Sequence, residues 1–543
     1  MMPKGQQDAG EGRPRLPIIY LRGFAGPTDS INTQTDDPFY GFNTGATHIR
    51  VDGNGDPAFY QFEGPMLRLM TDENYQLLVH GDQQRLLNTA EEHSLAADSI
   101  WVYRFYDQAA TTFGPEQDEG GVLKHLVRAV KGHIAAPGFN IETAAVSLYE
   151  FTGQVLSKTE NTGVSKVYLV AHSMGGLVAR CMIQKICQLD GRTPAKDLVA
   201  SLYTFGTPHG GIVTDSGLVN WAEQHVGPAG SDIFSPRLMY GYLTPGKSLG
   251  DLAPDGWDPR VISSVDFDVK EDVFCFIGTD PKDYSAIPRV TVGPKSDGLV
   301  RIENAYVKGA NRAYALRSHS GPYGEVNSEE GYQNLRRFLF GRWKVTAMFI
   351  GLPDSVPADP VWQADVRLAV RGLPVLLSEQ QAAHWCPIQL NEELGSVQDA
   401  PDHPVPLVTT YLMDPRHLAH GREPAHGGRA RYVLTLRVFS MRESKGVFDF
   451  TDHLEQVPDW AGSLIADVGP NPAGDGLNCW AAWANDVPGR NADQDPITDS
   501  PLPFIRTADG YTTQIDLPAT ATSLAILNPA AKLALSVNDR VPG

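Results

Sequence analysis

The chain has 543 residues, of which 42% are hydrophobic and 20% are charged, and its formal net charge is −19. That length exceeds what one ordinary hydrophobic core organises, so we expect more than one domain. The composition is typical of globular proteins. The negative charge, with no basic patch to offset it, argues against nucleic-acid binding, because phosphate backbones would repel such a chain.

The sequence shows neither a membrane span nor a classical export signal. It contains no run of about 18 apolar residues, so no transmembrane helix is predicted. The first residues, MMPKGQQDAGEGRPRLP, lack the apolar stretch of a signal peptide, which indicates a cytoplasmic protein; export by a non-classical route, or a trimmed signal, stays open. The five cysteines are odd in number and scattered, and we expect reduced structural thiols.

Strand and helix patterns alternate along the first two thirds of the chain. After a polar, Gly-rich stretch at 1–14, apolar runs predict strands at 16–21, 99–106, 166–171, 198–205, 273–278 and 312–316. Helical periodicity predicts helices at 141–159, 174–190 and 328–340. Such alternation is typical of a mostly parallel sheet covered on both faces. We therefore predict an α/β domain over residues 15–343.

Two long insertions interrupt this pattern, at about 27–97 and 212–265. Both exceed ordinary connections, and both contain several aromatic residues. Two interpretations stay open. The aromatic side chains either form a cap or lid over an apolar substrate or, as is commoner, pack a small core of the insertion itself.

The last part of the chain, residues 344–543, has a different texture. Short alternating stretches such as 361–370, 432–439 and 512–517 are separated by Pro- and Gly-rich connections. This pattern predicts an all-β, sandwich-like domain. Binding of a carbohydrate, a lipid surface or a partner, or a purely structural role, all stay open for it.

The most informative segment is VYLVAHSMGG at 167–176, where a strand pattern meets a helix pattern at Ser173. Small residues stand two before and two after this serine, as a tight turn requires. The pattern resembles the nucleophile elbow G-x-S-x-G, with Ala171 in place of the first glycine. The competing interpretation is a helix N-cap serine without catalytic role.

A serine nucleophile needs a base to take its proton and an acid to orient that base, and in this elbow arrangement both follow the serine. The loop SDGLV at 296–300 offers Asp297, and SHSG at 318–321 offers His319. Each follows a predicted strand, where such sites are built. Asp280 stands directly after the strand at 273–278 and is an alternative acid.

Two other histidines compete for the role of base. His209, in GTPHGG at 206–211, precedes every acid candidate, so its order in the chain is wrong for the base. We expect it to shape the site wall. His172 adjoins the serine on the strand and should point away from it.

The tetrahedral intermediate of ester cleavage needs two hydrogen-bond donors for its oxyanion. One is expected to be the backbone N–H of Met174, directly after the nucleophile. The other is expected from the loop RGFAG at 22–26, where glycines flank Phe24 and let the backbone approach the substrate.

Together these pieces resemble the bacterial lipases and carboxylesterases of the α/β-hydrolase superfamily, over roughly residues 15–343. The resemblance rests on RGFAG, AHSMGG at 171–176, GTPHGG, and SDGLV followed by His319. It implies an α/β-hydrolase fold and assigns the acid to Asp297. The chain has Arg22 where such lipases often have histidine, and no calcium or zinc ligand set of the family maps onto it.

The sequence thus predicts a serine hydrolase that cleaves carboxylic esters through an acyl-enzyme on Ser173, with Asp297 and His319 completing the triad and no cofactor or metal. The expected substrate is a small-molecule or lipid ester, and transient contact with a lipid surface stays open, as does the oligomeric state. The alternatives are an amidase, thioesterase or acyltransferase with the same triad, a phospholipase effector, and an interaction protein on a hydrolase scaffold.

Overall fold

The structure is a computed structural model. It describes residues 13–21, 23, 49–51, 57–59, 64–78, 83–103, 141–160, 163–212, 234–248, 250–263, 266–282, 292–320, 324–397, 399–413, 429–441, 457–470, 477–484, 502–507 and 510–540. They divide into two compact units, one of Pro14–Leu335 and one of Met1–Arg13 with Arg336–Gly543. No helix in these ranges is long and apolar enough to cross a bilayer.

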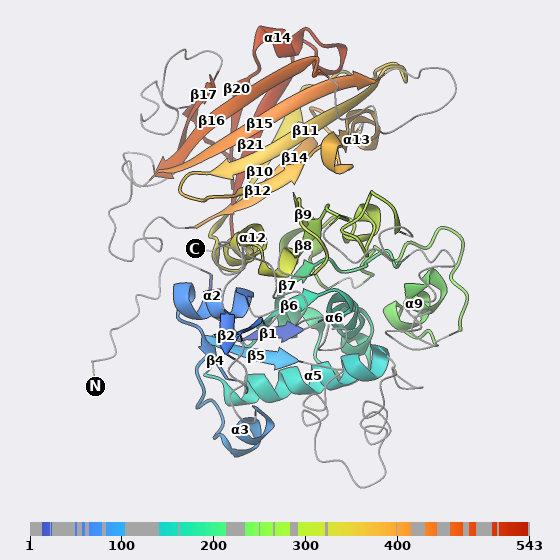
Figure 1. The fold of residues 1–543 in the computed structure, drawn as a ribbon, viewed down its shortest axis with the longest axis vertical. Coiled ribbons are helices and arrows are strands. Elements are labelled where there is room, and N and C mark those ends of the chain that lie inside the picture. The colour runs from blue at the N-terminus through green and yellow to red at the C-terminus, as the bar shows by residue number, and fades with distance from the viewer. Residues whose placement is uncertain are drawn as a thin grey trace. The chain divides into compact units, whose positions relative to one another are not determined.

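The first unit is built on a seven-stranded parallel sheet (Figure 1). Its order is β4-β5-β1-β6-β7-β8-β9, and every described strand pair in it is parallel. The strands are β1 (Ile18–Leu21), β4 (Gln76–Leu77), β5 (Ser99–Tyr103), β6 (Val167–His172), β7 (Val199–Phe205), β8 (Val273–Gly278) and β9 (Asn311–Ala315). The predicted α/β fold class is confirmed, and β4 is a strand that the sequence did not indicate.

The central strands are buried along their whole length, because helices cover a parallel sheet on its faces. The helix α6 (Met174–Gln184) packs against β6 and against α5 (Ile141–Lys158). The remaining helices of this part are α2 (Gly64–Glu73), α3 (Gln83–Thr89), α7 (Ala195–Leu198), α9 (Pro236–Leu243), α10 (Val269–Asp272) and α12 (Glu329–Phe340), with 3₁₀ turns η2 (Ile186–Gln188), η4 (Ile302–Asn304) and η5 (Glu325–Asn327). A separate hairpin pairs β2 (Ile49–Val51) with β3 (Pro57–Phe59).

The order of the strands locates the site. From β1 the chain passes to β4 and β5 on one side of β1, and then to β6 on the other. The order therefore reverses between β1 and β6, and a crevice opens at the carboxyl ends of strands at such a switch point. Ser173 directly follows β6 at this place.

The second unit contains two antiparallel sheets and confirms the predicted all-β region (Figure 1). One sheet has the order β14-β10-β21-β20-β19, and the other β12-β11-β15-β16-β17-β18, with β13 also paired to β11. Their bounds are β10 (Trp343–Ile350), β11 (Val361–Val370), β12 (Leu376–Gln380), β13 (Ile388–Gln389), β14 (Val405–Leu412), β15 (Ala430–Met441), β16 (Trp460–Pro470), β17 (Leu477–Trp483), β18 (Leu502–Pro503), β19 (Ile505–Thr507), β20 (Gly510–Asp516) and β21 (Lys532–Asp539). Short helical pieces are α13 (Leu390–Ser396), α14 (Ala519–Thr522), η6 (Ala382–His384) and η9 (Ala525–Leu527).

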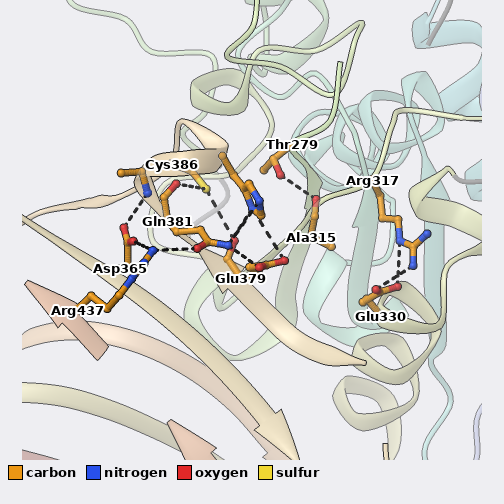
Figure 2. Close-up of polar contacts among 11 residues, drawn as sticks. Thr279, Ala315, Arg317, Glu330, Asp365, Glu379, Gln381, Cys386 and Arg437 are labelled. Carbon is orange, nitrogen blue, oxygen red and sulfur yellow. Dashed lines mark hydrogen bonds and ion pairs between the residues drawn. The ribbon is translucent and has the colours of Figure 1, made fainter. Parts of the chain in front are cut away.

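Both sheets contribute to one core, which includes Phe349 of β10, Val366 of β11 and Leu436 of β15, each at most 1% exposed. This is the packing of a β-sandwich. Ionic pairs link register partners on neighbouring strands. Figure 2 shows one of them, in which Arg437 of β15 donates to Asp365 of β11.

Candidate active site

Ser173 occupies a sharp turn between β6, which ends at His172, and α6, which begins at Met174. Its φ of 52° and ψ of −129° are strained for a residue with a side chain, which is a mark of functional turns. The close packing behind the turn needs glycine: a Cβ added to Gly176 would lie 2.1 Å from Thr207 Oγ1. Thr207 in turn donates to the carbonyl of Ser173 across 2.9 Å.

The three residues Ser173, Asp297 and His319 lie together in the order that nucleophilic catalysis needs. Nε2 of His319 is 3.0 Å from Oγ of Ser173, and Nδ1 of His319 is 2.8 Å from Oδ2 of Asp297. Because a carboxylate only accepts, Nδ1 carries the proton and Nε2 is left to accept the serine O–H. The side chains are nearly buried, with 8%, 1% and 3% exposure.

The loop that carries Asp297 holds this carboxylate in place. Its second oxygen, Oδ1, accepts the backbone N–H groups of Leu299 at 2.9 Å and Val300 at 2.7 Å. The N–H of His319 donates to the carbonyl of Asp297 at 2.9 Å, which ties the loop after β8 to the loop after β9. The alternative acid, Asp280, accepts the N–H of Lys282 at 2.8 Å within its own turn.

The segment before His319 is fixed to α12. Arg317 donates from Nε and from a terminal nitrogen to the two carboxylate oxygens of Glu330, at 3.2 and 3.0 Å, and Figure 2 shows this two-point contact. The same view shows Thr279 donating to the carbonyl of Ala315. The two bonds between Arg317 and Glu330 restrict the orientation of Arg317 more than a single ion pair would.

The prediction that His172 points away from the site is wrong. Its ring lies 4.9 Å from the ring of His319, and its Nε2 is 3.1 Å from the backbone carbonyl of His319. A carbonyl only accepts, so His172 carries its proton on Nε2. The loop after β9 folds back over the end of β6, and that long-range contact decides the environment of His172.

His209 lies behind the elbow and is 0% exposed. Its Nε2 is 3.1 Å from Oγ1 of Thr204, and burial lowers the pKa of His209 well below its usual value. Its backbone carbonyl accepts from the buried guanidinium of Arg180 at 3.2 Å. His209 is thus a buried packing group whose neutral form is favoured.

Of the two expected oxyanion donors, the structure describes Met174 but not Phe24. Met174 is buried at the N-terminus of α6, where backbone N–H groups favour negative charge. Phe24 lies outside the described residues. Its neighbour Gly23 is described, and a Cβ added there would lie 2.7 Å from Cβ of Ser173. The backbone after β1 therefore reaches the serine directly.

One buried acid at the site was not predicted from the sequence. Glu325, in η5, is 0% exposed, and its Oε1 lies 3.8 Å from Nδ1 of His319. Its Oε2 accepts the N–H of Gly278 at 2.9 Å. Burial, then repulsion by Asp297, raises the pKa of Glu325 well above its usual value. No motif marks this position, six residues after His319 in a polar loop.

Within the described ranges, one group of His, Cys, Asp or Glu side chains brings its donor atoms within 4.8 Å of one another: His172, His319 and Glu325. A metal ion there would compete with hydrogen bonds. His319 already uses Nδ1 toward Asp297, and His172 uses Nε2 toward a carbonyl. Two of its three members are thus engaged through these nitrogens, whereas Oε1 of Glu325 has no hydrogen-bond partner among the described residues.

The described part of the second insertion buries several aromatic side chains, and its helix α9 packs on α6. Phe234, Tyr240 and Tyr242 are buried, and Tyr240 meets Trp257 edge to face at 5.2 Å between ring centroids. Leu252, by contrast, is 77% exposed. The aromatic residues of the first insertion lie largely outside the described residues.

One comparison with known proteins, to a family model, bears on the chemistry of this chain. Residues 126–231 match the family model described as "Putative serine esterase (DUF676)". The matched segment includes Ser173 and His209 and ends before Asp297. A search of curated proteins found no match. The family match supports a serine esterase, and hence a hydrolase.

Several solved structures are distantly similar. The lin2722 gene product of Listeria innocua shares 12% identity over 60% of this chain and 94% of its own, with a TM-score of 0.26. Phospholipase PlaB from Legionella pneumophila shares 12% identity over 79% of this chain and 87% of its own, with a TM-score of 0.30. Mature lipase BlEst2 from Bacillus licheniformis shares 13% identity over 60% and 91%, with a TM-score of 0.26. At these scores the likenesses carry no argument about substrate.

Proposed function

We propose that this protein is a carboxylic ester hydrolase, a lipase or esterase, that forms an acyl-enzyme on Ser173. The single observation that carries the proposal is the chain of contacts from Oγ of Ser173 to Nε2 of His319 at 3.0 Å and from its Nδ1 to Asp297 at 2.8 Å. An N-cap serine without catalytic role needs no such pair, and the side chain of Ser173 makes no cap hydrogen bond to α6.

In the proposed reaction, Nε2 of His319 takes the proton of Ser173 as Oγ bonds to the ester carbonyl carbon. The carbonyl electron pair moves onto oxygen, where the N–H groups of Met174 and Phe24 stabilise it. Collapse breaks the bond to the leaving alkoxide, which receives the proton from His319. A water molecule, deprotonated by the same histidine, then cleaves the acyl-enzyme and releases the acid and free Ser173.

The strained conformation of Ser173 suits this reaction, because it projects the oxygen out of the turn at the N-terminus of α6. In the scheme the carboxylate of Asp297 stabilises the imidazolium that forms on His319. We further propose that residues 15–343 carry the reaction and that residues 344–543 form an accessory domain.

The test compares hydrolysis of p-nitrophenyl esters from acetate to palmitate by the wild type and by Ser173→Ala. We expect kcat/KM to fall at least about 10³-fold in the variant. The matched control is Ser94→Ala, since Ser94 is an exposed serine whose hydroxyl donates to the nearby carbonyl of Glu91. Labelling by a fluorophosphonate probe should occur in the wild type and in the control, and not in Ser173→Ala. Equal rates in all three proteins would refute the proposal.

A matched p-nitroanilide separates an esterase from an amidase with the same triad. The favoured acyl length in the ester series separates an esterase from a lipase. Preference for a long chain presented in micelles over the same chain as a monomer would indicate contact with a lipid surface.

A further inference from the structure

Glu325 is held as firmly as a residue of the proposed triad. Its backbone N–H donates to the carbonyl of Ser318 at 2.9 Å, and its own carbonyl accepts from Oγ of Ser328 at 2.7 Å. The carboxyl group is anchored at one oxygen only, by the N–H of Gly278. The backbone therefore fixes Glu325 beside the residue that precedes His319.

The second oxygen, Oε1, faces the imidazole. It has no hydrogen-bond partner among the described residues, and it lies 3.8 Å from Nδ1 of His319. The room it occupies exists because position 206 is glycine: a Cβ on Gly206 would lie 1.8 Å from Oε1 of Glu325 and 2.9 Å from Nδ1 of His319. Gly206 has φ +48°, a conformation that suits glycine.

A buried carboxyl oxygen without a partner is costly, and its position against a reactive imidazole calls for an explanation. Nδ1 of His319 bears the proton that Asp297 accepts, and Oε1 of Glu325, when that carboxyl is ionised, is the next acceptor in reach. A movement of less than 1 Å along the line joining the two atoms would bring 3.8 Å to hydrogen-bond distance.

We propose that Glu325 is a second carboxyl partner of His319, a positioning residue that accepts the Nδ1–H when Asp297 does not. The inference rests on the proposed function of Ser173 and His319. In the resting protein Nδ1–H of His319 donates to Asp297, and burial raises the pKa of Glu325, which favours its neutral form. When Asp297 is lost, the ring turns to Glu325 and keeps the tautomer that leaves Nε2 free to accept from Ser173.

Among the described residues, several titratable groups lie around Glu325. Asp297 repels its negative form, His319 attracts it once protonated, and the phenol of Tyr203 is a further titratable neighbour. The strand β8, which packs on η5, contributes the buried thiol of Cys275. The helix α2 also packs on η5, and its Arg68 is ion-paired with Glu329 rather than with Glu325.

The experiment measures kcat/KM on p-nitrophenyl butyrate in Asp297→Ala with and without Glu325→Gln. Alanine is chosen because asparagine would offer its amide to Nδ1 and impose the wrong tautomer. We expect Asp297→Ala to lower kcat/KM by about 10²- to 10³-fold. This is less than the roughly 10⁴-fold loss expected for a histidine without any carboxylate partner. Adding Glu325→Gln should lower the rate by about a further 10-fold or more.

The matched control is Asp297→Ala with Glu329→Gln, because Glu329 is also a buried glutamate, four residues after Glu325, and pairs with Arg68. The kcat/KM of this control double variant should equal that of Asp297→Ala alone. Thermal melting of each variant checks folding. If Asp297→Ala does not fold, Asp297→Ser takes its place, because serine presents no amide N–H to Nδ1, and the same direction of change is expected.

The pH dependence of activity in Asp297→Ala is a second measurement. A purely structural role of Glu325 would not change it. Ionised Glu325 accepts the Nδ1–H better than neutral Glu325, so activity of Asp297→Ala should keep rising at a pH where the wild type has reached its plateau. This measurement stands even if the double variant does not fold. Coincident plateaus, or equal rates with and without Glu325→Gln, overturn the inference. Wild-type activity in Ser173→Ala would instead refute the proposed function itself.

Discussion

The imidazole of His172 donates its Nε2–H to the backbone carbonyl of His319, 3.1 Å away, and thereby holds the residue proposed as the base from behind. This bond joins the end of β6 to the loop after β9, two segments that meet only in the folded chain. The side chain of His172 is 1% exposed, so water does not replace the bond when it is lost.

We therefore predict that His172→Ala lowers kcat on p-nitrophenyl esters by about 10-fold with little change in KM, because the position of His319 loosens while substrate contacts stay. His93→Ala is the control, since Nδ1 of His93 bonds a carbonyl in the same way, to Thr159 at 2.9 Å, far along the chain from the site. Equal kcat values in the two variants would show that the bond does not position the base.

The elbow gives a second prediction, on stability. Gly176→Ala forces a methyl group onto Thr207, where 2.1 Å separates the new Cβ from Oγ1. We expect a loss of about 1–3 kcal/mol, the usual cost of overpacking, together with lost activity.

Gly153→Ala is the matched control, because Gly153 lies in α5, is exposed, and an added Cβ there meets nothing within 4 Å. That substitution should stabilise the protein by about 0.5–1 kcal/mol, because alanine is the better helix former. Urea unfolding of the two variants measures both values. A neutral Gly176→Ala would mean that the turn relaxes easily.

The elements that the sequence predicted best are those with a strong local signal. The run at 273–278 is β8 without a shift at either end, because a strand buried on both faces is apolar throughout. The alternating stretch at 361–370 likewise coincides with β11. In contrast, β4 is only Gln76–Leu77, and it is a strand because its backbone pairs with β5, which no local pattern announces.

The candidate site divides in the same way. Ser173, Asp297 and His319 could be singled out because each stands in a short motif after a strand, and the structure brings the three together; their catalytic roles stay a prediction. The place of Glu325 and the orientation of His172 depend on how the loop after β9 folds back. There the N–H of Glu325 donates to the carbonyl of Ser318, and Nε2 of His172 donates to the carbonyl of His319. No local sequence pattern predicts long-range contacts of this kind.

A third prediction concerns the guanidinium of Arg180, which is 0% exposed. It donates to the carbonyls of His209, Pro259 and Val261 at 2.8–3.2 Å, and burial lowers its pKa to about 10. The planar fork reaches several carbonyls that the single ammonium of lysine cannot reach together.

Arg180→Lys should therefore cost about 2–4 kcal/mol of unfolding free energy and speed hydrogen exchange in residues 257–263. Arg192→Lys, in a residue that stacks on the ring of Tyr149 at 4.5 Å, is the control and should leave that exchange unchanged. Unaltered exchange in Arg180→Lys would mean that other contacts hold this part of the insertion.

The fourth prediction follows from the raised pKa of Glu325. In the folded protein this group keeps its proton above the usual value of 4.5, whereas in the unfolded chain it ionises there. The native state thus binds more protons in this window, so its stability falls as pH rises from 4.5 to the folded pKa. Glu325→Gln removes this loss and keeps an oxygen that can accept from Gly278.

Unfolding free energies of the wild type and Glu325→Gln, measured by urea from pH 4 to pH 8, test this. The unfolding free energy of the variant, relative to that of the wild type, should rise by up to about 1.4 kcal/mol per pH unit above 4.5. This rise should stop at the pH where Glu325 ionises in the folded state. A difference that is constant across the range, which a fixed packing or hydrogen-bond effect would produce, would contradict the prediction. A difference that shrinks as pH rises would reverse its sign and require Glu325 to be ionised in the native protein.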